Sequence, residues 1–330
     1  MKNILLSLIL PCYNVEKYIV KCLDSLYNQD MPEIDYEVIC VNDCSPDATS
    51  DIIMRYQKQH ENLILINHEV NKKQGGARNT GLKAAKGKYI WFIDPDDYIR
   101  ANCLKELLTQ AEENKLDILF FNFEKVDEKG IFFEKNDFNF TNQVCCGKDI
   151  FLNRTEWWKN SNYCWARIVR KNLFVENNLF FYENFYHEDE TFGVQCFLHA
   201  DKIQFTPEVL YFYRQHLTSS LAVEKKWDSL AGRTKCAVEF YKIALKVDEN
   251  YLKNEVFLWI AQSYTDSLFK SILYLSQKDR NKFYEKLKLI DDLPVLFPIC
   301  NKRTKIALTS KFLMSVLHVV LMPIKKKNKN

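Results

Sequence analysis

The feature that most constrains the fold is a regular alternation, over the first 125 residues, of short apolar segments with amphipathic helical segments. The apolar segments are rich in Ile, Leu, Val and Phe throughout, as expected for strands that are covered on both faces. They are residues 5–11, 37–43, 62–67, 89–94 and 116–124. Alternation of this kind predicts right-handed crossovers and a mostly parallel, doubly wound α/β sheet.

Three segments between these predicted strands carry helix signals. Ser45-Pro46-Asp47 has the residue types that favour a helix start, because serine can cap, proline fits the first turn and aspartate complements the helix dipole. A further helix is predicted over about residues 76–86. The first predicted helix has one apolar face, at spacings of three and four, formed by Val15, Tyr18, Ile19, Cys22, Leu23, Leu26 and Tyr27.

The pattern changes after residue 125, and this predicts a division into three parts. Residues 127–165 are polar and aromatic without a clear period, whereas residues 203–214 alternate well enough for a strand or hairpin. Residues 227–290 are helical in pattern, with apolar residues at fourfold spacing at Leu252, Val256, Ile260 and Tyr264. We therefore expect an α/β core over 1–125, a second part of the same domain over 126–220, and a C-terminal helical region over 221–330.

Composition excludes several classes of protein. A chain of 330 residues that is 47% hydrophobic can bury a large core. A net charge of +3 gives no reason to expect nucleic acid as a partner. The eleven cysteines are irregularly spaced without a CxxC pair, so reduced thiols are expected rather than a zinc site or a disulfide framework.

No segment reaches the roughly 18 consecutive apolar residues of a membrane span, which favours a cytoplasmic protein. The apolar start of the chain resembles a signal peptide, but no small-residue cleavage site follows it, so we interpret it as a buried first strand. Near the C-terminus, residues 312–324 are apolar with lysines on both sides. They suit either peripheral contact with an anionic membrane surface or a helix packed within the protein.

Polar residues follow three of the predicted strands, where a doubly wound sheet binds its ligands, and four of them, after the second and fourth strands, are acidic. The first strand ends in Pro11-Cys12-Tyr13-Asn14, the second in Asn42-Asp43, and the fourth in Asp94-Pro95-Asp96-Asp97. Carboxylates held close together repel unless a cation or donors neutralise them. The cluster suits Mg²⁺ or Mn²⁺ holding a diphosphate, because such ions take a few carboxylates and fill their other positions with phosphate and water. The alternative is an acidic turn that caps the next helix.

Four of the eight glycines, including Gly76, lie between residues 75 and 87. Two cationic residues, Lys73 and Arg78, lie beside them in the sequence. Paired glycines at a helix start let backbone N–H groups approach a ligand, and the two cations add positive charge. The alternative is a capped loop with glycines that pack a helix. Neither GxGxxG nor a Walker GxxxxGK[ST] is present, so dinucleotide and P-loop sites lose support.

The segment His187-Glu188-Asp189-Glu190 precedes apolar residues at helical spacing. Acidic residues at a helix start often only complement the helix dipole. A carboxylate there can also act as a general base that removes the proton of an attacking hydroxyl, and Asp189 is the candidate.

These motifs, in this order, resemble the family 2 glycosyltransferases of the GT-A fold, of the type that builds bacterial surface polysaccharides. The resemblance covers roughly residues 4–220 and is carried by Pro11–Asn14, Asn42–Asp47, Gly75–Gly81, Asp94–Asp97 and Glu188-Asp189. It implies transfer of a sugar from a nucleoside-diphosphate sugar, most readily a UDP-sugar, to a hydroxyl of a glycan or lipid-linked glycan. Such enzymes are typically inverting and metal-dependent.

The resemblance also implies a role for each matching residue. Pro11, Tyr13 and Asn14 would line the nucleotide pocket, and Asp43 would hydrogen-bond the base. Gly76, Arg78 and Lys73 would border the donor. Asp94 and Asp96 would form the DxD pair, with Asp96 the direct ligand of Mn²⁺ or Mg²⁺ and Asp94 nearer the ribose. Asp189 would be the base.

Two positions depart from the common pattern, because Asn42 replaces a frequent aspartate and Cys44 a frequent glycine. A QxxRW-like element is absent, so single addition is expected rather than processive synthesis. Trp165-Ala-Arg167 and Leu210–Arg214 also resemble the family but receive no role beyond closing the acceptor side. The alternatives are a sugar-nucleotide-binding or scaffold subunit without turnover and, with less support, a nucleotidyltransferase. The latter would want a glycine-rich basic loop directly after the first strand.

Overall fold

A computed structural model describes residues 4–135, 143–147, 163–216, 226–246, 261, 265, 268–311 and 314. The chain divides into two compact units. The first contains residues 1–184 and 192–222, and the second contains residues 185–191 and 223–330. The three-part division expected from the sequence stays a prediction.

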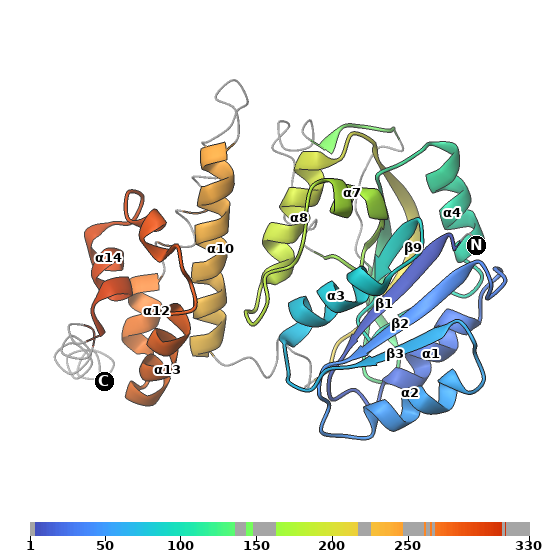
Figure 1. The fold of residues 1–330 in the computed structure, drawn as a ribbon, viewed down its shortest axis with the longest axis horizontal. Helices are drawn as coiled ribbons and strands as arrows, with labels where there is room; N and C mark the ends of the chain where they lie inside the picture. Colours follow the sequence, from blue (N-terminus) through green and yellow to red (C-terminus); the bar gives the residue numbers. More distant parts are fainter. Residues whose placement is uncertain are drawn as a thin grey trace. The chain divides into compact units, whose positions relative to one another are not determined.

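The first unit is an α/β unit built on one nine-stranded sheet (Figure 1). Its strands are β1 (Leu6–Cys12), β2 (Tyr36–Asn42), β3 (Leu63–Asn67), β4 (Tyr89–Phe92), β5 (Tyr98–Ile99), β6 (Ile118–Val126), β7 (Phe132–Lys135), β8 (Arg167–Arg170) and β9 (Ile203–Arg214). Its helices are α1 (Ile19–Tyr27), α2 (Thr49–Gln57), α3 (Lys73–Ala84), α4 (Leu104–Glu113), α7 (Lys171–Glu176) and, from Phe192 onward, α8 (Glu188–His199). The five strands predicted in the first 125 residues correspond to β1, β2, β3, β4 and β6.

The strand order is β3-β2-β1-β4-β8-β6-β9-β5, with β7 paired to β6. The pairs β2–β3, β1–β2, β1–β4 and β6–β9 are parallel. The short strands β5, β7 and β8 add antiparallel pairs, so the sheet is more mixed than the expected mostly parallel one. Because the connections from β1 to β3 and from β3 to β4 run in opposite directions along the sheet, right-handed crossovers put α1 and α2 on one face and α3 on the other (Figure 1).

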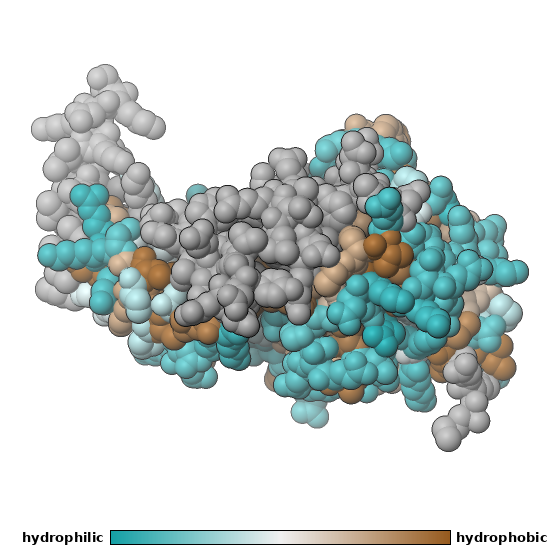
Figure 2. All heavy atoms as spheres, turned by 90° about the horizontal axis from the view of Figure 1, so that it is seen from above, coloured by the Kyte–Doolittle hydropathy of each residue, from teal (hydrophilic) through white to brown (hydrophobic). Residues whose placement is uncertain are grey.

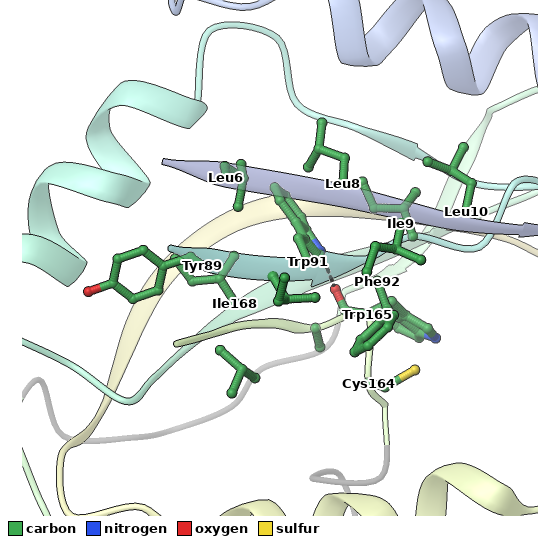
Figure 3. Packing of buried hydrophobic residues seen from close by; sticks show 14 of the residues in the cluster. Leu6, Leu8, Ile9, Leu10, Tyr89, Trp91, Phe92, Cys164, Trp165 and Ile168 are labelled. Carbon is green, nitrogen blue, oxygen red and sulfur yellow. Dashed lines mark hydrogen bonds between the residues drawn. The ribbon is translucent and has the colours of Figure 1, made fainter. Parts of the chain in front are cut away.

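The core of the first unit is centred on β1 and β4, which are buried along their whole length. Leu6, Leu8, Ile9 and Leu10 are completely buried in β1 and pack beside the aromatic residues of β4 (Figure 3). The indole N–H of Trp91 donates a hydrogen bond of 2.8 Å to the carbonyl of Trp165. This bond satisfies the one polar group of a fully buried side chain and fixes the strand beside the segment that leads into β8.

The second unit is helical in its described part. Its helices are α10 (Lys226–Lys246), α12 (Leu268–Tyr274), α13 (Gln277–Leu287), the 3₁₀ helix η1 (Leu293–Leu296) and α14 (Lys302–Thr309). Ser276 caps α13 by accepting a bond of 3.1 Å from Asp279 N, and Asn301 caps α14 through Thr304 N at 2.9 Å. Leu252, Val256, Ile260 and Tyr264 lie outside the described residues, as does most of the segment 312–324.

Among the helices that the structure describes, none combines the length and apolar character that crossing a membrane requires. On the face drawn in Figure 2, hydrophilic residues cover much of the described surface, and apolar residues form separate patches between them.

Candidate functional site

The loops that follow β1, β2, β3 and β4 lie at one edge of the sheet, because these strands run parallel. We call this edge the carboxyl rim; it consists of residues 13–16, 43–47, 68–73 and 93–97. Its first two loops are joined directly. The backbone N–H of Val15 donates to Thr49 Oγ1 at 3.0 Å, and that of Glu16 donates to Asp47 Oδ2 at 3.0 Å. The predicted site segments after β1, β2 and β4 are thus brought to one edge.

Asp43 is buried at the start of its loop, with 2% of its surface exposed. Its Oδ1 accepts two hydrogen bonds, from His68 Nδ1 at 2.7 Å and from the backbone N–H of Lys72 at 2.8 Å. Its Oδ2 is buried too, yet no described residue donates to it. A buried acceptor without a donor costs free energy, so Oδ2 is available to an N–H group of a ligand.

The acidic turn after β4 separates its three carboxylates. The side chains of Asp94 and Asp96 are 16% and 23% exposed, whereas Asp97 is completely buried. Arg78 Nη2 donates to Asp94 Oδ1 at 2.8 Å, so this cation compensates a carboxylate of the rim directly. Asp94 and Asp96 therefore remain within reach of a ligand, and Asp97 departs from the expectation that all three gather at the open edge.

Asp97 is held inside the protein by two donors from β9. Its Oδ2 accepts a bond of 2.7 Å from the Tyr211 hydroxyl, and its Oδ1 accepts one of 2.7 Å from the backbone N–H of Arg214. Burial raises the pKa of the Asp97 carboxyl well above its usual value, and the charges of Asp96 and Asp94 raise this pKa further. Its role is to anchor the turn that carries the other two aspartates.

His216 is a residue of this site that sequence analysis missed. Its side chain is 3% exposed, its Nε2 lies 2.9 Å from Asp96 Oδ2, and its ring packs on Tyr18 with 4.3 Å between centroids. It stands two residues after β9, which pairs in parallel with β6. The rule that selected the residues after β1, β2 and β4 would have found His216 if β9 had been recognised as a parallel strand.

The glycines of α3 have packing roles that the structure makes explicit. A Cβ atom on Gly76 would lie 2.4 Å from Lys72 Cβ, and one on Gly81 would lie 2.3 Å from Ile9 Cγ2. Both distances are far below van der Waals contact, so the absence of side chains lets α3 lie close to β1 and to Lys72, the residue that precedes the helix. Helix α3 begins at Lys73, three residues earlier than predicted, and Lys73 has a φ of +61°.

The residues after β1 differ in exposure. Pro11 is a buried residue of β1 itself and is paired with Val41. Tyr13 is 49% exposed, and Asn14 is exposed with a φ of +56°. Tyr13 and Asn14 are therefore accessible to a ligand at the rim, and their predicted roles in a nucleotide pocket, like that of Pro11, stay predictions.

Asp189 is the second residue of α8 and belongs to the second unit. The preceding His187 has a φ of +65°, and its Nε2 lies 2.9 Å from Ser229 Oγ. Its Nδ1 lies 3.2 Å from Glu190 Oε1. These contacts define the start of α8 within the second unit, and the role of Asp189 as a base stays a prediction.

Within the described ranges, no group of three or more His, Cys, Asp or Glu side chains is arranged to hold a metal ion alone. Mg²⁺ and Mn²⁺ sites that act on nucleotides commonly use only one or two protein carboxylates, with phosphate and water as further ligands. A pair such as Asp94 and Asp96 is compatible with that kind of site.

Comparison with known proteins decides the family. Residues 7–177 match the family described as Glycosyl transferase family 2, which is more than half of the chain. The chain belongs to glycosyltransferase family 2.

Similar curated proteins come from several bacteria. The chain is 34% identical to the uncharacterized glycosyltransferase EpsJ of Bacillus subtilis (strain 168), over 67% of this chain and 64% of that protein. It is 35% identical to the poly(ribitol-phosphate) beta-glucosyltransferase of Bacillus spizizenii, over 63% of this chain and 32% of that protein. It is 28% identical to the poly(ribitol-phosphate) beta-N-acetylglucosaminyltransferase TarS of Staphylococcus aureus (strain MW2), over 86% and 47%. The chain thus spans less than two thirds of the length of each of these relatives.

Solved structures confirm the predicted GT-A fold. Residues 1–349 of S. aureus TarS in complex with UDP-GlcNAc superimpose with a TM-score of 0.67 at 25% identity, covering 96% of this chain and 88% of that one. A mannosyltransferase from Pyrobaculum calidifontis, in complex with GDP-Man and Mn²⁺, has a TM-score of 0.52 at 16% identity, with coverage of 96% and 88%. This second likeness concerns the fold alone.

Proposed function

We propose that this family 2 chain transfers a sugar from a UDP-sugar to a hydroxyl of a glycan or lipid-linked glycan acceptor. The observation that carries the proposal is that the carboxyl rim holds both a buried acceptor to which no described residue donates, Asp43 Oδ2, and the accessible pair Asp94 and Asp96. The first suits an N–H group of a nucleobase and the second a cation that holds a diphosphate. The UDP-GlcNAc complex of TarS and the polymer acceptors in the relatives' names support this donor and acceptor class.

The remaining predicted site residues take the roles that family membership suggests. Tyr13 and Asn14 border the nucleotide beside Pro11, and Lys73 and the Gly76–Arg78 segment border the diphosphate and sugar. Arg78 acts partly through Asp94, because their ion pair keeps that carboxylate in place. We also propose that the protein is located in the cytoplasm. Membrane contact through residues 312–324 stays a prediction, since most of that segment lies outside the described residues.

The residues of the acidic turn fit Mn²⁺ or Mg²⁺. Asp96 offers a partly exposed carboxylate, and His216 places an imidazole nitrogen 2.9 Å from that carboxylate. Carboxylate oxygens suit both ions, and an imidazole nitrogen is acceptable to Mn²⁺. Asp96 and Asp94 would hold the ion, with phosphate oxygens and water in its other positions, and His216 would orient Asp96. When bound, the ion would neutralise the charge that develops on the departing diphosphate.

Asp189 is the proposed general base. In an inverting transfer the acceptor oxygen forms a bond to the anomeric carbon while the bond from that carbon to the diphosphate oxygen breaks. The acceptor proton passes to the Asp189 carboxylate, and UDP leaves with the electron pair of the broken bond. Asp189→Asn keeps the shape of the side chain but cannot accept this proton. One sugar is added in each encounter, as the sequence predicts.

The test combines binding with turnover. The chain is incubated with Mn²⁺ and either UDP-GlcNAc or UDP-glucose, and its melting temperature and the release of UDP in the presence of a poly(ribitol phosphate) acceptor are measured. A ligand at about 100 times its Kd stabilises a protein by about 2.7 kcal/mol, which is readily detected. Asp96→Ala should lose the Mn²⁺-dependent part of the stabilisation. Asp189→Asn should keep it and lose turnover, and the exposed Asp51→Asn serves as the control.

Two results would contradict the proposal. If no nucleotide sugar stabilises the wild-type chain, the donor site is wrong. If donors bind but UDP release is absent in wild type and Asp189→Asn alike, the chain is a binding or scaffold subunit instead.

A further inference from the structure

The imidazole of His68 joins three segments at the carboxyl rim. His68 directly follows β3, and its backbone N–H donates to the carbonyl of Asn42 at the end of β2 at 2.9 Å. Its side chain is 6% exposed. Nδ1 lies 2.7 Å from Asp43 Oδ1, and Nε2 lies 2.8 Å from Thr80 Oγ1 on α3. A buried side chain with both ring nitrogens engaged has one orientation, so His68 is a rigid link between Asp43 and α3.

The chemistry of the Asp43 carboxylate determines which atom donates the hydrogen bond between Asp43 and His68. An ionised carboxylate can only accept hydrogen bonds, so Nδ1 carries the hydrogen that it shares with Asp43. The N–H of Lys72 donates to the same oxygen at 2.8 Å. Both donors therefore converge on Oδ1, and neither meets Oδ2. This explains why Oδ2 is the oxygen without a donor among the described residues.

The backbone around this oxygen is held as well. Asn71 Nδ2 donates to the carbonyl of Asp43 at 3.1 Å, and Asn71 Oδ1 accepts from the backbone N–H of Lys73 at 3.2 Å. The main chain of Asp43 is thus held in place, and one oxygen of its carboxylate accepts from two fixed donors. A group that is already oriented loses little entropy on binding, which favours a ligand that offers an N–H to Oδ2.

We propose that His68 is a positioning residue for the nucleobase of the donor. It engages Oδ1 of Asp43 and thereby presents Oδ2 to a ring N–H, such as the N3–H of uracil. This inference rests on the proposed function, because it requires a nucleotide at the rim. Cytosine has a bare acceptor nitrogen at the same ring position, and two facing acceptors repel. The pair His68 and Asp43 therefore selects uridine over cytidine nucleotides.

Base recognition can be separated from a purely structural role by comparing two ligands. UDP has the base, and inorganic pyrophosphate has only the diphosphate. If His68 acts through Asp43 on the base, His68→Ala weakens UDP and leaves pyrophosphate unchanged. If His68 only stabilises the fold, its loss lowers the melting temperature and affects the two ligands equally.

The experiment measures Kd by calorimetry for UDP, CDP and pyrophosphate, each with Mn²⁺, in wild type and in folded variants. His68→Ala should weaken UDP about three- to tenfold, as expected for one hydrogen bond, and change pyrophosphate less than about twofold. It should also reduce the preference for UDP over CDP. His68→Asn retains an N–H donor near the position of Nδ1 and should recover most of the UDP affinity.

His60 provides a matched control, because its Nδ1 lies 2.9 Å from a carboxylate oxygen of Glu33 away from the carboxyl rim. His60→Ala should leave all three affinities unchanged. Should His68→Ala not fold, Thr80→Val carries the test, since it removes the support of Nε2 with a side chain of the same shape. The same UDP-selective loss is then expected.

Equal loss of UDP and pyrophosphate, or unchanged UDP binding in a folded His68 or Thr80 variant, overturns the role of His68 and leaves the proposed function intact. Failure of wild type to bind UDP overturns both proposals together.

Discussion

The hydroxyl of Tyr211 on β9 donates a hydrogen bond of 2.7 Å to Asp97 Oδ2, and it accepts one of 3.1 Å from the backbone N–H of Asp94. One phenol thus fixes both ends of the acidic turn from a strand more than a hundred residues later. The turn carries the proposed metal ligand Asp96 between these two anchors. Its geometry therefore depends on the interior of the sheet.

The first prediction concerns the way in which Asp97 makes the unfolding free energy depend on pH. Burial raises its pKa in the folded chain, whereas an unfolded aspartate has a pKa of about 3.9. The folded state therefore holds this proton more tightly. The contribution of the carboxyl to stability is complete below about pH 4 and is lost as the pH rises through the folded-state pKa. Urea unfolding of wild type and Asp97→Asn at several pH values should show the difference in unfolding free energy falling as pH rises. A constant difference would show that Asp97 is not responsible.

The second prediction concerns the packing of α3 on β1. Gly81→Ala places a Cβ 2.3 Å from Ile9 Cγ2, so we expect a loss of about 1–3 kcal/mol in unfolding free energy. Ile9→Ala removes the opposing methyl at the cost of a cavity. The double variant should be more stable than the sum of the two single losses predicts, which chemical denaturation can measure. Strict additivity would mean that the two residues are not in contact.

The third prediction concerns Cys44, which has a φ of +61°, in the left-handed region that favours glycine. A residue with a Cβ is strained by about 1–2 kcal/mol in this region, and a glycine removes this strain. Part of the resulting gain in stability is offset, because glycine has a larger backbone entropy in the unfolded chain. Cys44→Gly should therefore raise the unfolding free energy by up to about 1 kcal/mol. Cys44→Ala keeps the Cβ and should leave stability nearly unchanged. Equal effects of the two variants would assign the change to the thiol.

The fourth prediction concerns Asn79, whose side chain exchanges two hydrogen bonds with the backbone of Phe181. Nδ2 donates to the Phe181 carbonyl at 2.8 Å, and Oδ1 accepts from the Phe181 N–H at 2.9 Å. Asn79→Ala leaves two buried backbone groups without partners, so a loss of about 2 kcal/mol or more is expected. The exposed Asn114→Ala also loses a bond to a backbone carbonyl, of 3.0 Å, and should change stability by less than about 0.5 kcal/mol. Thermal unfolding of both variants compares the two, and similar losses would contradict a special role for Asn79.

Much of the first unit could be predicted because the signals for its strands lie within short contiguous segments of the sequence. Apolar residues dominate β1, β2 and β4, and the polar and acidic residues that follow them identify a ligand edge by a general rule of parallel sheets. The short strands β5 and β8 carry no such periodic signal. Their pairing with β9, and with β4 and β6, is set by neighbours distant in the chain. The same limit hid His216, which reaches Asp96 only because β9 enters the sheet in parallel beside β6.

The sequence by itself determined the α/β class, the positions of the first strands along the chain, the family and the chemical types gathered at the carboxyl rim. These follow from periodicity and from the residues at strand ends, which are properties of contiguous segments. Only the tertiary structure decided that Asp97 turns inward while Asp96 stays accessible, that His68 and Lys72 share one oxygen of Asp43, and that the other oxygen has no donor among the described residues. Burial and hydrogen bonding between residues far apart in the chain are collective outcomes of packing, and no single segment encodes them.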